Sequence, residues 1–107
     1  SVKTQLLNKE QIVDFAEGKT GFRTIHMDAK EGLFINGKHV KIKGSCEHHG
    51  FGCLGAVANK AVIKRKLEIL RSMGVNAIRT AHNMPSVEFM ELTDEMGFLV
   101  DSEAFDL

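Results

Sequence analysis

The chain has 107 residues and carries 14 Lys and Arg against 14 Asp and Glu, so its formal net charge is zero with histidine neutral. Hydrophobic residues make up 43% and charged residues 26%, which is typical of a globular domain and not of a disordered chain. Zero net charge gives no general attraction to nucleic acid or to an anionic membrane. The sequence has no apolar run near the roughly 20 residues that span a bilayer, and residues 1–10 lack the apolar stretch of a secretory signal. We therefore expect neither nucleic acid nor membrane as a partner, and the compartment, cytoplasmic or periplasmic, stays open.

Short runs typical of β-strands fill the first part of the chain. They span residues 5–7, 12–15 and 21–27, and turn-forming residues separate them. A hairpin follows, in which residues 32–35 and 39–43 are joined by Asn36-Gly37, a pair that tolerates positive φ at both turn positions. We interpret the runs before residue 30 as the last strands of a β-sandwich.

From Val40 onward the periodicity changes to strand, helix, strand, helix and strand. Asn59 is a good N-cap, so the first helix is predicted to start there, and Gly74 is placed to end it. The second helix lies after the single proline and is closed by Gly97 in the same way. The strands that follow the helices are predicted over residues 75–79 and 98–101. Basic residues of the first helix are expected on its solvated outer side, namely Lys60, Lys64, Arg65, Lys66 and Arg71.

This order is that of an α/β domain whose parallel strands are joined by helical crossovers. A closed eight-stranded barrel of such units takes about 250 residues, so we expect the domain to be incomplete at Leu107. The change of periodicity places the boundary between the β part and the α/β part near residue 40. An unfinished sheet is expected to expose apolar surface, and therefore to depend on the remainder of a parent chain or to self-associate as a homo-oligomer.

Polar side chains gather at the predicted carboxyl ends of the parallel strands, which form the active face in such folds. In strand order, the segments are Cys46-Glu47-His48-His49, Arg79-Thr80-Ala81-His82-Asn83 and Asp101-Ser102-Glu103. Arg79, His82 and Glu103 together suit a polyhydroxylated or anionic substrate, because sugar hydroxyls need both hydrogen-bond donors and acceptors. The structural alternative is an ion-pair network that braces the strand ends.

Three further chemistries are open for residues 46–55. Zinc is one, because the segment contains two cysteines and two histidines, although their spacing matches neither of the usual paired patterns. A Cys-His nucleophile pair that uses Cys46 is another. The string Gly50-Phe51-Gly52-Cys53-Leu54-Gly55 has the pattern G-x-G-x-x-G, which binds a dinucleotide where it opens onto a helix. Here residues 56–58 intervene before the helix cap, and the second strand ends in Arg79 where a ribose-binding acid is expected.

Several strings of this sequence match one known family. They are Gly21-Phe22-Arg23-Thr24, residues 34–38, Lys43-Gly44, His48-His49, residues 74–83 and residues 94–106, of which Arg79-Thr80-Ala81-His82-Asn83 is the most specific. These strings resemble family 2 glycoside hydrolases, and the β-galactosidases most of all. The resemblance implies an immunoglobulin-like sandwich that runs into a (β/α)₈ TIM barrel. Residues 1–30 would be the end of the sandwich, and residues 31–107 would begin the barrel with three strands and two helices.

The resemblance also implies a function, the retaining hydrolysis of terminal β-linked sugars. It assigns Arg79 to support of the catalytic nucleophile, His48 and His82 to the sugar, and Glu103 to the shape of the sugar site, and Asn83 belongs to the same string as His82. The catalytic glutamates of the family lie on later barrel strands, so they are expected beyond Leu107 and the segment alone is expected to be inactive. We expect no cofactor and no metal ligands in this segment. The specificities of β-glucuronidases and β-mannosidases stay open, because those enzymes share parts of these motifs.

Overall fold

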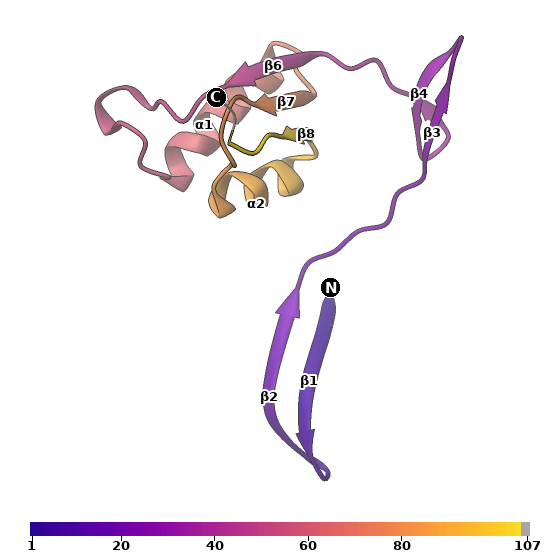
Figure 1. The fold of residues 1–107 in the computed structure, drawn as a ribbon, viewed down its shortest axis with the longest axis vertical. Coiled ribbons are helices and arrows are strands. Elements are labelled where there is room, and N and C mark those ends of the chain that lie inside the picture. Colours follow the sequence, from indigo (N-terminus) through magenta and orange to yellow (C-terminus); the bar gives the residue numbers. More distant parts are fainter. Residues whose placement is uncertain (106–107) are drawn as a thin grey trace. The chain divides into compact units, whose positions relative to one another are not determined.

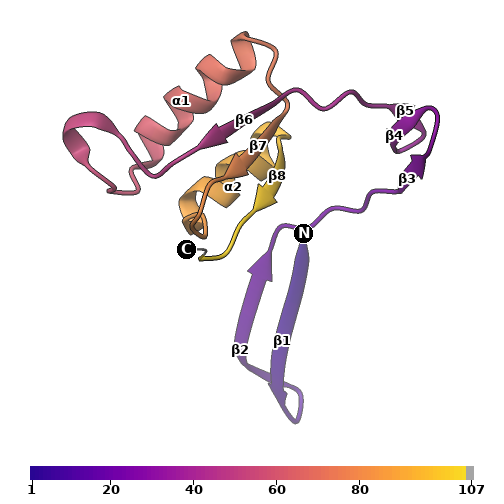
Figure 2. The same cartoon turned by 45° about the horizontal axis from the view of Figure 1, so that its top comes forward.

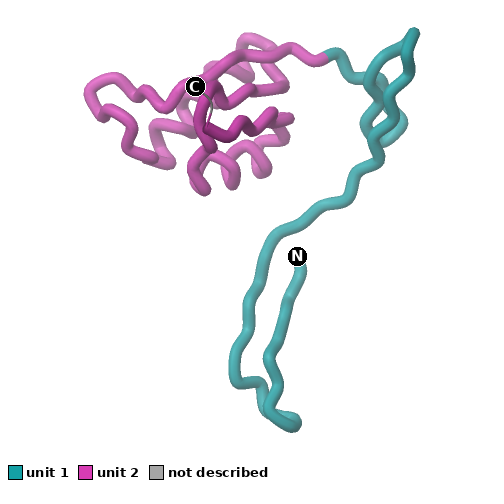
Figure 3. The backbone as a smooth tube through the Cα atoms, viewed as in Figure 1, with its two compact units in different colours: residues 1–41 teal, residues 42–107 magenta. Residues whose placement is uncertain are grey.

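The computed structural model describes residues 1–105, so the predicted match at Asp106 and the position of Leu107 lie outside the described residues. The contacts divide the chain into two compact units, residues 1–41 and the residues from Ile42 onward (Figure 3). The domain boundary expected between residues 30 and 31 stays a prediction. Among the residues described, no helix has the length and apolar character needed to cross a membrane.

The first unit consists of two antiparallel sheets (Figure 1). The strands are β1 (Val2–Asn8) paired with β2 (Gln11–Gly18), and β3 (Ile25–Asp28), β4 (Gly32–Ile35) and β5 (Lys38–His39) paired in the order β3-β4-β5. Every residue of β1 and β2 is exposed, and Phe15 is exposed by 70%. This unit therefore exposes apolar side chains, while the exposure and self-association expected of the unfinished parallel sheet stay predictions.

The predicted Asn36-Gly37 turn is confirmed. Asn36 has a φ of 51° and Gly37 a φ of 72°, the positive values that a two-residue hairpin turn requires. The Asn36 side-chain oxygen accepts a hydrogen bond from the Thr24 N–H at 2.9 Å, and the Asn36 N–H donates to the Thr24 carbonyl at 3.0 Å. Thr24 directly precedes β3. Asn36 therefore both forms the turn after β4 and fixes the start of β3.

Two predicted strand boundaries are wrong. The run at residues 21–27 forms a strand only from Ile25, because its partner Ile35 is the last residue of β4 before the turn. The strand predicted over residues 39–43 ends at His39, and the next strand begins only at Gly44. The Lys43 N–H donates to the Asn76 side-chain oxygen at 2.8 Å. Asn76 lies directly before the strand at Ala77–Thr80, so the chain at Lys43 is bonded to the second unit and not to β5. This partner lies 33 residues away and gives no local signal.

The second unit contains a parallel three-stranded sheet and two α-helices (Figures 1 and 2). Its elements are β6 (Gly44–Glu47), a 3₁₀ turn η1 (Gly52–Leu54), α1 (Lys60–Ser72), β7 (Ala77–Thr80), α2 (Val87–Met96) and β8 (Leu99–Ser102). The sheet order is β6-β7-β8, so each helix joins neighbouring parallel strands. The predicted alternation of strand and helix is confirmed. Because β6 starts later than predicted, Cys46 and Glu47 lie within the strand and not after it.

The first helix begins at the predicted Asn59 cap, and the second ends at the predicted Gly97. The Asn59 side chain accepts hydrogen bonds from the Ala61 and Val62 N–H groups, which have no partner inside the helix. Ser86 caps α2 in the same way. Gly97 ends α2 with a φ of 73°, a left-handed conformation that costs glycine nothing.

The two faces of the sheet differ because successive side chains of a strand point to opposite sides. Ile78 lies on the face that the helices cover, in a buried apolar cluster with Ile63, Leu67 and Phe98. Arg79 lies on the other face, in register with Cys46 of β6 and Asp101 of β8 (register row 46, 79 and 101). Cys46 and Asp101 are exposed and Arg79 is partly exposed, so this face is open among the described residues.

The buried apolar cluster predicts which side chains of α1 contribute most to the free energy of unfolding. Leu67 is 1% exposed, so Leu67→Ala is expected to lower the free energy of unfolding of this unit by about 2–5 kcal/mol, the usual cost of a core cavity. Ile69 lies on the same helix but is 47% exposed, so Ile69→Ala should cost well under half as much. Urea denaturation followed by circular dichroism measures both variants. Equal destabilisation by the two substitutions would contradict the assignment of the buried face.

Candidate functional site

Four of the five predicted site residues meet where the parallel strands end. His48 follows β6, Arg79 lies in β7, His82 lies in the loop after β7 and Glu103 directly follows β8. The strands β6, β7 and β8 are parallel, so their carboxyl ends lie at the same edge of the sheet. Asn83 is half-buried in the same loop as His82, and the structure assigns its side chain no contact that bears on the site.

The Glu103 carboxylate joins two of these residues. One oxygen accepts a hydrogen bond from Arg79 Nε at 2.5 Å, and the other accepts from the His82 backbone N–H at 2.7 Å. The Glu103 N–H in turn donates to the Thr80 hydroxyl at 3.1 Å, and Thr80 is 3% exposed. Both oxygens of the carboxylate therefore have donors, one of them the Arg79 guanidinium.

His82 has an unusual backbone. Its φ is 67°, in the left-handed region that costs a residue with a side chain roughly 1–2 kcal/mol. The bond from its N–H to the Glu103 carboxylate is charge-assisted, and such bonds contribute about 1.5–3 kcal/mol. The two magnitudes are similar, so the carboxylate offsets the strain of this conformation.

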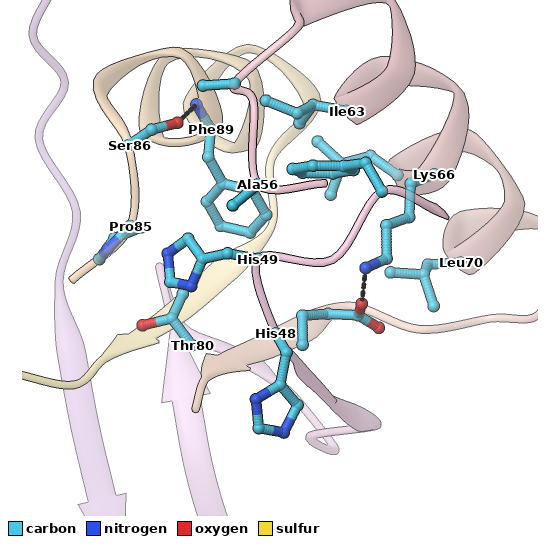
Figure 4. A pocket seen from close by; sticks show the side chains of 14 residues that line it. His48, His49, Ala56, Ile63, Lys66, Leu70, Thr80, Pro85, Ser86 and Phe89 are labelled. Carbon is cyan, nitrogen blue, oxygen red and sulfur yellow. Dashed lines mark hydrogen bonds and ion pairs between the residues drawn. The ribbon is translucent and has the colours of Figure 1, made fainter. Parts of the chain in front are cut away.

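The two adjacent histidines after β6 lie in different surroundings. The His48 ring lies 5.6 Å from the His82 ring, centroid to centroid, at an interplanar angle of 37°. The His49 ring instead lies beside Pro85 and Phe89 on the helix side of the sheet, while His48 points away from them (Figure 4). His49 Nε2 lies 3.0 Å from the carbonyl oxygen of Met84. His49 therefore follows the carboxyl end of β6, as expected, but its ring lies toward the helices and not toward His82.

Arg79 is held by groups on both neighbouring strands. Besides Glu103, its Nη1 lies 3.7 Å from the Cys46 sulfur on β6. The hydrogen bond to Cys46, and next to it the bond and the charge of Glu103, raise the pKa of Arg79 above its ordinary value. The guanidinium is therefore cationic at neutral pH. Cys46, considered as a nucleophile paired with histidine, has Arg79 as its hydrogen-bonding neighbour instead.

Lys66 corrects the prediction of a solvated basic face on α1. Its ammonium group forms an ion pair with the Glu47 carboxylate, whose side chain is only 13% exposed (Figure 4). Glu47 also accepts from the Ser45 hydroxyl at 2.9 Å, and the Lys66 ammonium lies 5.5 Å from the centre of the Phe51 ring. The signal was present in the sequence, because Lys66 follows Ile63 by three residues and so borders the buried stripe of the helix.

An apolar pocket lies between the helices and the loop after β6 (Figure 4). It is lined by Glu47, His48, His49, Phe51, Ala56, Ala58, Ile63, Lys66, Leu67, Leu70, Thr80, Pro85, Ser86 and Phe89. Two of its polar side chains have partners within the lining, since Glu47 pairs with Lys66 and Ser86 accepts from the Phe89 N–H at 3.2 Å. The pocket shares His48 and Thr80 with the group at the strand ends, whereas Arg79, His82 and Glu103 do not line it.

Comparison with known proteins decides the family. Residues 27–105 match the family model described as "Glycosyl hydrolases family 2, TIM barrel domain". The chain belongs to glycosyl hydrolase family 2. A β-galactosidase of Bacteroides ovatus is 45% identical over 104 residues, which are 97% of this chain and 12% of that protein. A β-glucuronidase of Bacteroides fragilis is 32% identical over 91 residues, which are 85% of this chain and 13% of that protein.

Solved structures agree with this family assignment. A β-glycosidase from Bacteroides vulgatus has a TM-score of 0.92 at 39% identity, covering 97% of this chain and 14% of that one. A β-glucuronidase from Ruminococcus gnavus, in complex with uronic deoxynojirimycin, has a TM-score of 0.85 at 28% identity, covering 94% of this chain and 17% of that one. The chain thus contains part of a family 2 TIM barrel domain, and spans 12–13% of the length of the two curated relatives named above.

The other chemistries find little support in the geometry of this family 2 segment. The glycine string folds back on itself, because Phe51 N–H donates to Gly55 carbonyl at 2.8 Å and Gly55 N–H to Gly52 carbonyl at 3.0 Å. The helix N–H groups that would bind a phosphate are instead bonded to Asn59. Within residues 1–105, no group of three or more His, Cys, Asp or Glu side chains is arranged to hold a metal ion.

The Glu47–Lys66 pair makes a testable contribution to stability. Lys66→Met keeps the apolar stem but leaves a mostly buried carboxylate without its cation, so the free energy of unfolding should fall by about 1–3 kcal/mol. Lys64→Met removes the exposed pair with Glu68, whose side chains are 60% and 58% exposed, and should cost about 0.5 kcal/mol or less. Urea denaturation of both variants checks this. A Lys66→Met variant as stable as Lys64→Met would contradict a structural role for the pair.

Proposed function

We propose that this chain is part of a retaining glycoside hydrolase that removes terminal β-linked sugars, and that the sugar is a β-galactoside. The observation that carries the proposal is the group formed by Arg79, His82, Glu103 and His48 at the strand ends of a family 2 barrel segment. Relatives of this chain are named as β-galactosidases and β-glucuronidases, and the relative that is 45% identical is named as a β-galactosidase. β-Glucuronide is therefore the second substrate to test.

The proposal gives each of the five predicted residues a part in the sugar site. His48 and His82 present imidazoles that donate to or accept from sugar hydroxyls, and Asn83 follows in the same loop. Arg79 supplies a positive charge that supports the catalytic nucleophile, and Glu103 shapes the site through its two bonds. The substrate that fits is a carbohydrate, because such a ligand offers donors and acceptors together.

Neither nearby glutamate is proposed as an acid/base or a nucleophile. Glu103 has a donor on each oxygen, and Glu47 pairs with Lys66 on the helix side of the sheet. Retaining hydrolysis needs two carboxyl groups about 5–5.5 Å apart. These groups are assigned to later strands of the barrel, so the enzyme depends on the remainder of the parent chain.

The same reasoning assigns the architecture. The strands β6, β7 and β8 would be the first three of the barrel, with α1 and α2 on its outside. This is supported by the parallel order and by helices that cover only one face of the sheet, as the outer ring of a barrel does. Residues 1–30 would be the end of an immunoglobulin-like sandwich, and the barrel domain would start at residue 31.

The test uses the full-length gene product that contains this sequence. We expect it to release nitrophenol from p-nitrophenyl β-D-galactoside faster than from the β-D-glucuronide. His82→Ala should lower kcat/KM for the galactoside by roughly 10–100-fold, since one or two hydrogen bonds to the sugar are lost. His26→Ala, an exposed histidine of β3, is the matched control and should leave kcat/KM unchanged. Turnover of neither substrate by the wild type would overturn the proposal, and faster turnover of the glucuronide would reassign the sugar.

A further inference from the structure

We propose that Thr80 and Glu103 are positioning residues that form a clamp on the backbone of His82 and thereby set the direction of its imidazole. The inference deepens the proposed function and rests on it for the role of His82 at the sugar. It concerns side chains from the ends of two neighbouring strands, β7 and β8, acting on the loop that follows β7.

The first step is the bond that defines the clamp. The Glu103 carboxylate accepts from the His82 N–H at 2.7 Å, while His82 has a φ of 67°. A residue with a side chain leaves this left-handed region unless its surroundings hold it there. The Ala81 N–H donates to the Glu47 carbonyl at 3.0 Å, so the chain just before His82 is tied to β6. His82 thus lies between two fixed points, the β6 backbone and the Glu103 carboxylate.

The second step is what holds the carboxylate itself. The Glu103 N–H donates to the Thr80 hydroxyl at 3.1 Å, and the Arg79 Nε donates to the other carboxylate oxygen at 2.5 Å. Thr80 is 3% exposed on the helix side of the sheet, where its side chain has little freedom to move. The Thr80 part of the clamp is therefore buried in the core, whereas the Glu103 carboxylate contacts the loop that carries His82.

The consequence concerns the two rings. With the backbone of His82 held in this conformation, its ring lies 5.6 Å from the ring of His48, which belongs to a different strand end. In an ordinary right-handed or extended conformation the Cα–Cβ bond of His82 would point elsewhere, and the two imidazoles would no longer face one site. Two imidazoles that face one site can contact two hydroxyls of the same sugar.

The direct test is a crystal structure of the full-length gene product, wild type and Glu103→Gln. Glutamine is of the same size, but it has no charge and one acceptor oxygen, so the charge-assisted bond to the His82 N–H is lost or weakened. We expect His82 to leave the positive φ region in the variant and the distance between the two ring centroids to grow beyond 5.6 Å. Asp101→Asn, which removes a carboxylate from the same strand, should leave His82 in place. A Glu103→Gln structure with His82 still near 67° and the rings unmoved would overturn the clamp.

Thr80 is tested by a second pair of variants. Thr80→Val keeps the buried shape but removes the hydroxyl that accepts from Glu103, so His82 should shift as it does in Glu103→Gln. Thr80→Ser keeps the hydroxyl and should restore the wild-type conformation of His82. If Thr80→Val does not fold, the Glu103→Gln structure decides alone.

Kinetics separate a positioning role from a merely structural one. Glu103→Gln should raise KM for the β-galactoside about tenfold with a smaller change in kcat, because the sugar loses a correctly directed contact. In a His82→Gly background the ring is absent and glycine adopts the left-handed conformation freely, so the same substitution should change KM less than about threefold. Equal effects in both backgrounds would overturn the role through His82. If the wild type does not turn over either substrate, the proposed function is overturned, but the clamp is still tested by the crystal structures, which do not depend on activity.

Discussion

The four residues of β7, Ala77–Thr80, serve both faces of the parallel sheet, and the rest of the second unit depends on that division. Ile78 is buried with residues of α1, which fixes the face that the helices cover. Arg79 must then point to the opposite face, because side chains alternate along a strand. A slip of one residue would expose Ile78 and bury the guanidinium, so the apolar core determines where the charge lies. The register of β7 therefore determines both which side chains form the core and which side chains reach the candidate site.

One carboxylate connects that register to the loop that carries a candidate sugar-binding histidine. Glu103 accepts from Arg79 and from the His82 backbone, and its own N–H is bonded to buried Thr80. A partly buried polar network of this kind is stable only when each member has a partner, because an unpaired group there costs more than the bonds gain. The same contacts therefore serve stability and the geometry of the site. This explains how a strained backbone at His82 persists within the fold.

Residues that are adjacent in the sequence are divided between the two sides of the sheet. Glu47 pairs with Lys66 on the helix side, His48 faces His82, and His49 lies beside Phe89 in the pocket. The sequence predicts that polar residues cluster at the strand ends, since the carboxyl ends of parallel neighbours share an edge. The sequence does not predict which of these polar side chains faces the helices and which faces the opposite side of the sheet. That depends on the register of β6, and a hydrogen bond from Lys43 to the distant Asn76 helps to set it.

The sequence alone determined the features whose physical cause lies within a few residues. Asn59 caps a helix and Asn36-Gly37 makes a turn through backbone groups nearby, and the order of strands and helices follows from periodicity over single segments. Tertiary structure decided the features that need a distant partner. Lys66 was expected in solvent, but its ammonium bonds a carboxylate 19 residues earlier in the chain, at position 47. The bond from His82 to Glu103 spans 21 residues and joins a backbone group to a side chain, which neither composition nor spacing encodes. Local propensities fix what each segment becomes, whereas the assembled sheet fixes which donors and acceptors come within reach of one another.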